Sequence, residues 1–297
     1  MKITVFTPTY NRAYIIANLY HSLQRQTFTD FEWVVIDDGS SDDTELLFQK
    51  WIAENNKFLI RYYKQENGGK CRAINRALDL AKGELFFTVD SDDYLTNDAL
   101  KKIVFWFQQI KNQKEIVGIV ANCGYGVTET ENYCFDELYL DKTLLDRYSF
   151  CRDGHRVFDG ERAFVFYTKF HKKYKYPEFP NENFMTEAVA WNRMAHDGYK
   201  MRFYNDIIWV YEYKEAGLTK AGSSVFINNP RGYGLWLKEK AEFEEVSNKE
   251  KLKMYYTFTC DLSEKYDNKT IAKCIEAPVG LISVFNVIHK LIRWLRK

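Results

Sequence analysis

Hydrophobic and polar positions alternate between two patterns in the first part of the chain. Short apolar runs that are typical of buried strands are each followed by apolar residues at three- and four-residue steps, which is typical of a helix. Asp42 and Glu45 have the spacing of a capping box at the second helix. Strands are predicted at residues 3–7, 33–36, 58–63, 85–89 and 116–120, and helices at about 15–26, 42–52, 70–81 and 98–111. The alternation predicts an α/β fold with helices on both faces of a mostly parallel sheet.

Ligands of such sheets bind beyond the carboxyl ends of the strands. The loops after Phe6, Ile36, Tyr63 and Val89 all lie at those ends. Polar and aromatic side chains in or just after these loops are therefore expected to meet in one crevice. They are Tyr10, Asp37, Asp38, Lys70, Arg72, Asp90 and Asp92.

Residues 84–93 form an apolar run that ends in three acids, Asp90, Asp92 and Asp93. Carboxylates this close raise one another's pKa unless a cation lies between them. Mg²⁺ and Mn²⁺ prefer oxygen ligands, and they are commonly held by one or two carboxylates together with water and substrate phosphates. The stretch therefore predicts a divalent metal that handles a nucleotide diphosphate. The alternative is that Asp92 or Asp93 only caps the next helix.

Beyond Ala121 the alternation stops, although further elements can be assigned. They are a helix that contains Glu187, a strand at about 201–213, a loop at 217–234, and helices at about 236–246 and 249–266. The loop is rich in Gly, Ser and Asn, and we expect it to close over a bound diphosphate. The alternative for this loop is a plain surface connector.

The amino-acid composition limits the functional classes to which the protein can belong. Lys and Arg number 42 against 41 Asp and Glu, so a net charge of +1 gives no case for nucleic-acid binding. The six cysteines have no metal-binding spacing, and no secretory signal is recognised at the N-terminus, which favours free thiols in a reducing cytosol. No apolar stretch reaches the roughly 18 residues that a membrane span needs.

The last segment, residues 279–297, is predicted to be an amphipathic helix on a membrane surface. Its apolar residues recur at three- and four-residue steps, and basic residues and Trp294 lie among them. The apolar residues expected on one face are Val279, Ile282, Phe285, Ile288, Leu291, Ile292 and Leu295. The alternative is that this face docks on the catalytic domain or on a second subunit in a homodimer.

Four separated motifs together resemble the family 2 glycosyltransferases of GT-A fold. The motifs are Thr7-Pro8-Thr9-Tyr10-Asn11-Arg12, Asp37-Asp38-Gly39-Ser40-Ser41-Asp42-Asp43-Thr44, Asn67-Gly68-Gly69-Lys70 and Asp90-Ser91-Asp92-Asp93. They cover the first hundred residues in the order and spacing of the family, and the resemblance is thinner afterwards. It implies a nucleotide-sugar donor, usually a UDP-sugar, a divalent metal such as Mn²⁺ or Mg²⁺, and transfer with inversion at the anomeric carbon.

The resemblance also implies roles for individual residues. Tyr10 would stack on the base and Asp38 would hydrogen-bond its edge, with Asp37 beside it. Lys70 and Arg72 would meet the phosphates, and the remaining motif residues Pro8, Arg12 and Ser91 would line the donor site. Asp90 would face the ribose or the metal, and Asp92 matches the metal carboxylate of the family. The alternatives are a loop aromatic on the core for Tyr10, turn and cap residues for Asp37 and Asp38, and a solvated basic turn for Lys70 and Arg72.

Glu187 stands where the resemblance places the catalytic base, four residues before Trp191, and Thr186 replaces the usual first acid of the pair. A Glu can take a proton from an attacking sugar hydroxyl as an Asp does. The alternative is an acid in the first turn of a helix, where the macrodipole favours it.

The sequence thus predicts three functional parts: a nucleotide-sugar half at 1–122, an acceptor half at 123–235, and C-terminal helices at 236–297. We expect an enzyme that transfers a sugar to a glycan or a lipid-linked acceptor in cell-surface polysaccharide biosynthesis, at the inner face of a bacterial membrane. A nucleotidyltransferase is the rival enzyme, although Pro8-Thr9-Tyr10 is not the Gly-rich basic loop it would have after the first strand. A binding protein without activity is the rival if Glu187 is not a base.

Overall fold

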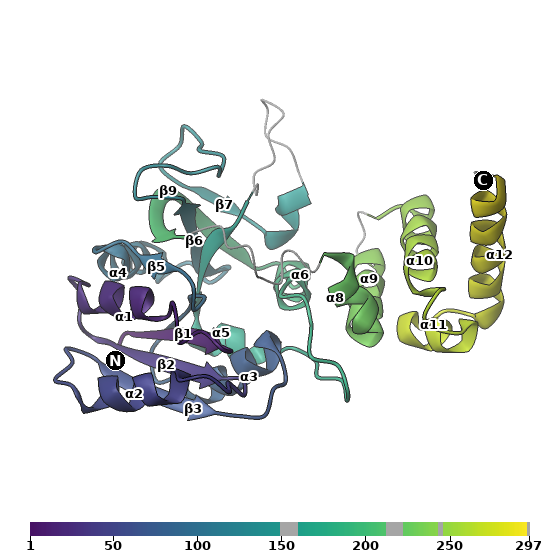
Figure 1. The fold of residues 1–297 in the computed structure, drawn as a ribbon. Helices are drawn as coiled ribbons and strands as arrows, with labels where there is room; N and C mark the ends of the chain where they lie inside the picture. The colour runs from purple at the N-terminus through teal and green to yellow at the C-terminus, as the bar shows by residue number, and fades with distance from the viewer. Residues whose placement is uncertain (149–159, 212–221, 243–245, 296–297) are drawn as a thin grey trace. The chain divides into compact units, whose positions relative to one another are not determined.

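The computed structural model describes residues 1–148, 160–211, 222–242 and 246–295, and it confirms the α/β architecture (Figure 1). The chain forms two compact units. The first comprises residues 1–175 and 190–214, and the second comprises residues 176–189 and 215–297. This division concerns packing only, so the three functional parts drawn from the sequence stay a prediction.

The predicted strand and helix alternation is confirmed in the first unit. Four parallel strands lie side by side in the order β3-β2-β1-β4, and Ile3 of β1 pairs with both Phe31 and Leu85. Their carboxyl ends therefore share one edge of the sheet. The elements are β1 (Ile3–Thr9), α1 (Ala17–Gln24), β2 (Phe31–Asp37), α2 (Thr44–Ala53), β3 (Leu59–Lys64), α3 (Lys70–Leu80), β4 (Leu85–Thr88) and α4 (Ala99–Ile110).

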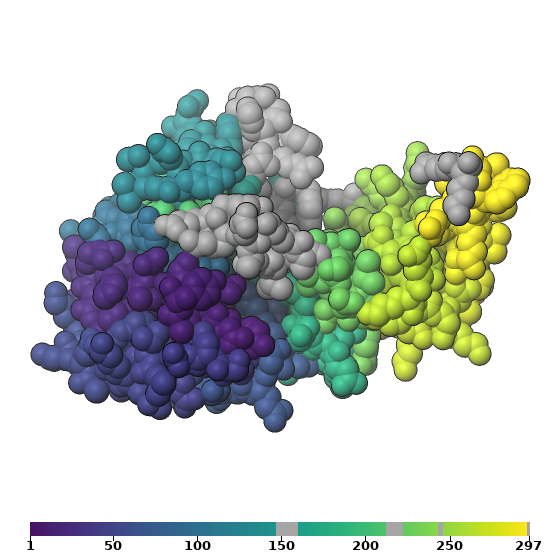
Figure 2. Space-filling model, in the orientation of Figure 1, coloured from purple at the N-terminus to yellow at the C-terminus, as the bar shows by residue number. Residues whose placement is uncertain are grey.

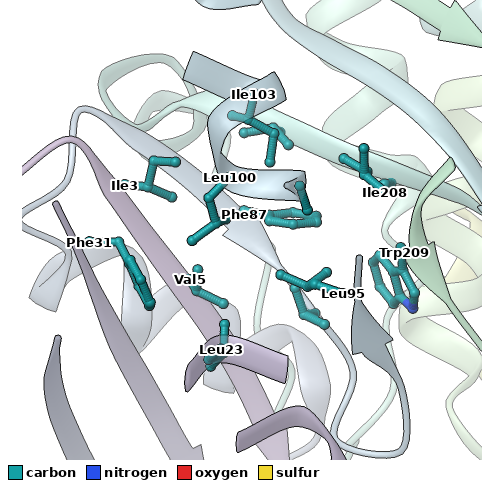
Figure 3. Packing of buried hydrophobic residues seen from close by; sticks show 14 of the residues in the cluster. Ile3, Val5, Leu23, Phe31, Phe87, Leu95, Leu100, Ile103, Ile208 and Trp209 are labelled. Carbon is teal, nitrogen blue, oxygen red and sulfur yellow. The ribbon is translucent and has the colours of Figure 1, made fainter. Parts of the chain in front are cut away.

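Side-chain alternation along the strands gives the sheet two buried faces. Ile3 and Val5 of β1 join Phe87 of β4 in a core that helices α1, α2 and α4 cover (Figure 3). The neighbouring positions point to the other face, where the rings of Phe6 and Phe86 stack at 5.5 Å. The sheet is therefore covered on both sides, as the sequence predicts.

Three strands of the described sheet were not predicted, and the longest of them is β8. Strand β8 (Arg162–Tyr167) is antiparallel to both of its neighbours and lies between β4 and β6 (Ile116–Gly124). Gly118 of β6 permits this pairing, because a Cβ atom there would lie 2.3 Å from the carbonyl oxygen of Val165. Beyond β6 the described part of the sheet continues with β9 (Lys200–Val210), to which β5 (Tyr94–Leu95) and β7 (Leu140–Lys142) pair.

The second unit contains its own helical core of seven buried apolar residues, among them Phe258 and Ile282. Its helices are α8 (Ser223–Asn228), α9 (Pro230–Glu242), α10 (Asn248–Leu262), α11 (Asn268–Ile275) and α12 (Val279–Leu295). Helix α12 confirms the predicted C-terminal helix.

The predictions of a loop at 217–234 and of a capping box at α2 were wrong. The loop expected at 217–234 is helical from Ser223 onward, and its residues up to 221 lie outside the described parts. Its glycines serve close packing, since a Cβ atom at Gly234 would lie 2.1 Å from the carbonyl oxygen of Cys274. The expected capping box of α2 does not form either, because Asp42 instead accepts hydrogen bonds from the backbone N–H groups of Ala13 and Thr44.

Candidate functional site

The loops after β1 and β2 are tied together by reciprocal hydrogen bonds. The backbone N–H of Asn11 donates to Ser40 Oγ at 2.8 Å, and the N–H of Ser41 donates to Asn11 Oδ1 at 2.8 Å. Asn11 has a φ of 51°, a left-handed conformation that Asn tolerates better than most residues. Next to this tie, the side chain of Tyr10 is 49% exposed, so its ring is accessible for stacking. Pro8 is the second-last residue of strand β1 and is half-buried.

Asp38 joins the loop after β2 to the loop that precedes α3. Its Oδ1 accepts hydrogen bonds from Gln65 Nε2 at 2.8 Å and from the N–H of Gly68 at 2.9 Å, and its Oδ2 accepts from the N–H of Gly69 at 2.7 Å. The residue is only 5% exposed. The carboxylate therefore fixes the turn from which Lys70 starts α3.

Asp37 has a different environment from its neighbour. It is fully buried, it accepts a hydrogen bond from the N–H of Ser40 at 2.7 Å, and it accepts a second from the hydroxyl of Tyr62. Burial, followed by this carboxylate, raises the pKa of Tyr62 well above its usual value. Asp37 therefore shapes the turn, and both of its oxygens already have protein partners.

Two carboxylates of the acidic stretch have cationic neighbours. Lys70 Nζ lies 2.9 Å from Asp90 Oδ1, and Arg12 Nη2 lies 3.9 Å from Asp92 Oδ2. The side chains of both members of the longer pair are 25% exposed. The structure thus brings the ends of β1 and β4 and the start of α3 together at one edge of the sheet, as the sequence predicts.

Asp93 is the last of the three acids, and the sequence suggests no role for it beyond a possible helix cap. It is 6% exposed, and burial, followed by the charges of Asp90 and Asp92, raises its pKa to about 8. The sequence signal for this raised pKa is the pair of adjacent acids, Asp92 and Asp93, at the end of an apolar run. Ser91, between Asp90 and Asp92, is also buried.

Arg72 lies in the first turn of α3, where its stem crosses the glycine turn. A Cβ atom at Gly68 would lie 2.8 Å from Arg72 Cδ, so the glycine leaves room for this side chain. Lys70 and Arg72 stand at the positive end of the helix dipole, and together they provide a basic start to α3.

Within the described ranges, no group of three His, Cys, Asp or Glu side chains is arranged to hold a metal ion. The site instead offers the two carboxylates of Asp90 and Asp92. This donor set fits a hard divalent ion that takes its other oxygens from water and from a diphosphate. Asp92 fits best, because its contact with Arg12 at 3.9 Å is long and its side chain is partly open to solvent.

Glu187 belongs to the second unit, and it lies in a turn directly before α6 (Ala188–His196) rather than inside a helix as predicted. Two side chains that the sequence analysis missed fix the segment before it. Asn229 Oδ1 accepts hydrogen bonds from the N–H groups of Asn183 and Phe184, at 2.8 and 3.1 Å. Glu182 accepts from the N–H groups at the start of α9, Arg231 at 2.8 Å and Gly232 at 2.9 Å. The sequence signal for this contact is an Asn directly before Pro230.

Comparison with known proteins gives a consistent family. Residues 4–197 match the family described as Glycosyl transferase family 2. The poly(ribitol-phosphate) beta-N-acetylglucosaminyltransferase TarS of Staphylococcus aureus is 34% identical over 150 residues, which cover 49% of this chain and 25% of TarS. The matched region therefore spans about a quarter of that relative.

Solved structures show the same fold. TarS residues 1–349 in complex with UDP-GlcNAc align with a TM-score of 0.61 and 19% identity, covering 99% of this chain and 92% of that one. The mannosyltransferase PcManGT from Pyrobaculum calidifontis, solved with GDP-Man and Mn²⁺, aligns with a TM-score of 0.58 and 17% identity, covering 96% and 87%.

Proposed function

The chain belongs to glycosyl transferase family 2. We propose that it transfers a hexosyl or N-acetylhexosaminyl group from a nucleotide-sugar to a hydroxyl group, and that the donor is of the UDP class that the resemblance above implies. The acceptor would be a glycan or a lipid-linked glycan in cell-surface polysaccharide biosynthesis. The observation that carries the proposal is the shared sheet edge, where Asp38 and Asn11 tie three loops around an exposed ring, a basic helix start and partly open carboxylates.

The donor is proposed to bind across this edge. The exposed ring of Tyr10 is available to stack on the base, and Asp38 Oδ2 keeps acceptor capacity toward the base edge after its bond to Gly69. Lys70 and Arg72 at the start of α3 would meet the diphosphate, which the positive end of the helix dipole also attracts. Both oxygens of Asp37 are occupied, so we assign it to the turn beneath the base.

A Mn²⁺ or Mg²⁺ ion is proposed to be held by Asp92, with Asp90 beside it. When bound, it would offset the negative charge that develops on the departing diphosphate. Arg12 would then be released from Asp92 and become available to a phosphate oxygen, because the two groups are joined only by a contact of 3.9 Å. Lys70 would stay with Asp90, at 2.9 Å, and would hold that carboxylate in place.

Glu187 is proposed as the general base. Its carboxylate would accept the proton of the acceptor hydroxyl as that oxygen attacks the anomeric carbon, which gives inversion in a single displacement. The bonds from Asn229 and Glu182 would keep the backbone before Glu187 in one conformation during this step. A fixed base loses less entropy on reaching the hydroxyl.

Two experiments test the proposal. UDP- and GDP-sugars would be screened for hydrolysis in the presence of Mn²⁺, which needs no acceptor, and release of the nucleoside diphosphate from at least one donor is expected. In Glu187→Gln we expect turnover to fall by roughly a hundredfold or more while donor affinity stays unchanged. An unaltered transfer rate in this variant would favour a different base, and hydrolysis of none of the donors would favour a binding protein without activity.

The proposed place of action is the cytoplasm, at the inner face of the cell membrane, where lipid-linked acceptors are extended. The basic and apolar character of residues 279–297 supports this placement. A homodimer formed through the same segment is the competing arrangement. Fractionation of cells that express the full chain would distinguish membrane-associated from free protein.

A further inference from the structure

Helix α12 has two apolar sides, and only one of them is used by the fold. Ile282 is fully buried in the core of the second unit, and the ring of Phe285 meets that of Tyr256 edge to face at 5.7 Å. On the same side, Asn286 Nδ2 donates to Asn268 Oδ1 at 2.9 Å. The sequence predicts that Ile282 and Phe285 belong to the membrane-facing apolar side, and this is wrong because they pack against α10 and α11.

The opposite side, which we call the outer face of α12, is apolar and exposed. Its residues recur at three- and four-residue steps, so they form one stripe along the helix. Each of them is at least 40% exposed: Val284 (54%), Val287 (57%), Ile288 (40%), Leu291 (55%), Trp294 (73%) and Leu295 (73%). Helix α12, drawn in yellow, lies on the surface of the second unit (Figure 2). A contiguous stripe of this kind marks a contact with a partner or a lipid surface.

Charge indicates which partner covers the stripe. Residues 268–297 contain six Lys and Arg and a single acid, Glu276, although the whole chain has a net charge of only +1. One of the six, Arg293, is paired with Glu264, and the others outnumber Glu276 by five to one. Lys290 is exposed on α12, one turn before Trp294. A second copy of the chain would bring the same positive charge to the contact, whereas an anionic surface complements it. The indole of Trp294 suits the headgroup boundary of a bilayer.

The length of the helix favours a contact along the surface. Among the described helices, no single one is long and apolar enough to cross a membrane, and α11 with α12 passes such a test only as a pair bent by 119°. The apolar residues of α11, Ile271 and Ile275, are fully buried inside the second unit. They are therefore engaged with protein, and of these two helices it is α12 that offers an exposed apolar stripe.

We propose that the outer face of α12 docks the protein on an anionic lipid bilayer, with the helix axis parallel to the membrane plane. The six apolar side chains enter the headgroup boundary, and Lys290 meets anionic headgroups beside them. Docking of this kind goes beyond the transfer reaction and does not depend on it, so a catalytically inactive variant still binds.

The test is co-sedimentation of the full chain with vesicles of phosphatidylglycerol and phosphatidylcholine in equal parts. Leu291→Glu puts a charge on the outer face, and Leu252→Glu is the matched control, because Leu252 is 49% exposed on α10 outside that face. We expect Leu291→Glu to weaken binding at least about tenfold, and Leu252→Glu to bind like the unchanged protein. Vesicles of phosphatidylcholine alone are expected to bind weakly.

A second variant, Lys290→Glu, tests the charge. It leaves the stripe intact, and it is expected to weaken binding to the anionic vesicles and to reduce its dependence on salt. Circular dichroism and light scattering of each variant report on folding and on oligomeric state. Failure of the unchanged protein to bind, equal binding by Leu291→Glu, or a dimer that Leu291→Glu splits into monomers would each overturn the proposal.

Discussion

Replacement of Asp38 by Asn separates its role in the loop from its proposed contact with the base. The carboxylate accepts three hydrogen bonds in a site that is 5% exposed, and two of the donors are the backbone N–H groups of Gly68 and Gly69. An amide has one carbonyl oxygen and one nitrogen, so Asp38→Asn must turn a donor toward one of those N–H groups. At least one buried N–H then has no acceptor.

The size of the effect follows from these contacts. An unsatisfied buried polar group costs about 1–3 kcal/mol, and the bonds that remain lose the strength of a charged acceptor. We therefore expect Asp38→Asn to lower the free energy of unfolding by about 3 kcal/mol, measured by denaturant titration. Because the glycine turn also positions Lys70, binding of UDP should weaken by roughly tenfold to a hundredfold.

Gly69→Ala is the matched control. Gly69 has a φ of 89°, so a side chain there strains the same turn, at a cost of about 1–3 kcal/mol, while the carboxylate of Asp38 is kept. Calorimetry with UDP and CDP then distinguishes the two roles. Both variants should weaken both nucleotides, and only Asp38→Asn should also reduce the preference for UDP. Unchanged stability in Asp38→Asn would refute its structural role, and an unchanged preference would refute the contact with the base.

Three further predictions follow from single contacts. Asp92→Ala should abolish metal-dependent donor hydrolysis, since it removes the carboxylate best placed for the ion; full activity at limiting Mn²⁺ would contradict this. Gly118→Ala should destabilise the fold by about 3 kcal/mol or more, because its Cβ atom would lie 2.3 Å from a carbonyl oxygen. Gly126→Ala is the control, because the space around Gly126 is open, and in denaturant it should unfold like the unchanged protein. Burial lowers the pKa of His171 to about 3, so below pH 6.5 the unfolded state binds a proton that the folded state does not, and stability falls as the pH falls. Between pH 7 and pH 5 the free energy of unfolding should decrease by about 2 kcal/mol. Denaturant titrations at both pH values should show this decrease in the unchanged protein and not in His171→Phe.

Local periodicity predicted those elements whose identity depends on their own residues. The first four strands and the helices after them have clear repeats, and their parallel pairing follows from the connections between them. Strand β8 has no such context, because it follows a long stretch without a repeat, and it is placed by pairing with β4 and β6, which the sequence does not display.

The sequence predicted which loops form the site, but it did not predict the hydrogen-bond partners of the individual side chains. Asp37 and Asp38 are identical neighbours in the sequence, yet one is engaged by Ser40 and Tyr62 and the other by the glycine turn. Likewise, a three- and four-residue repeat fits either side of α12, and only packing of Ile282 shows which side faces the protein. Such choices depend on residues far apart in the chain.

The position of β8 affects how the protein folds during synthesis and whether it can be expressed as separate fragments. During synthesis β4 and β6 leave the ribosome well before β8, the strand that lies between them. Until β8 is made, each of them has an unpaired apolar edge that can associate with other chains. A gene cut near residue 122 would make that state permanent in the N-terminal fragment. Expression of residues 1–122 alone should therefore give aggregates, and co-expression of the remaining chain, which supplies β8, should restore soluble protein.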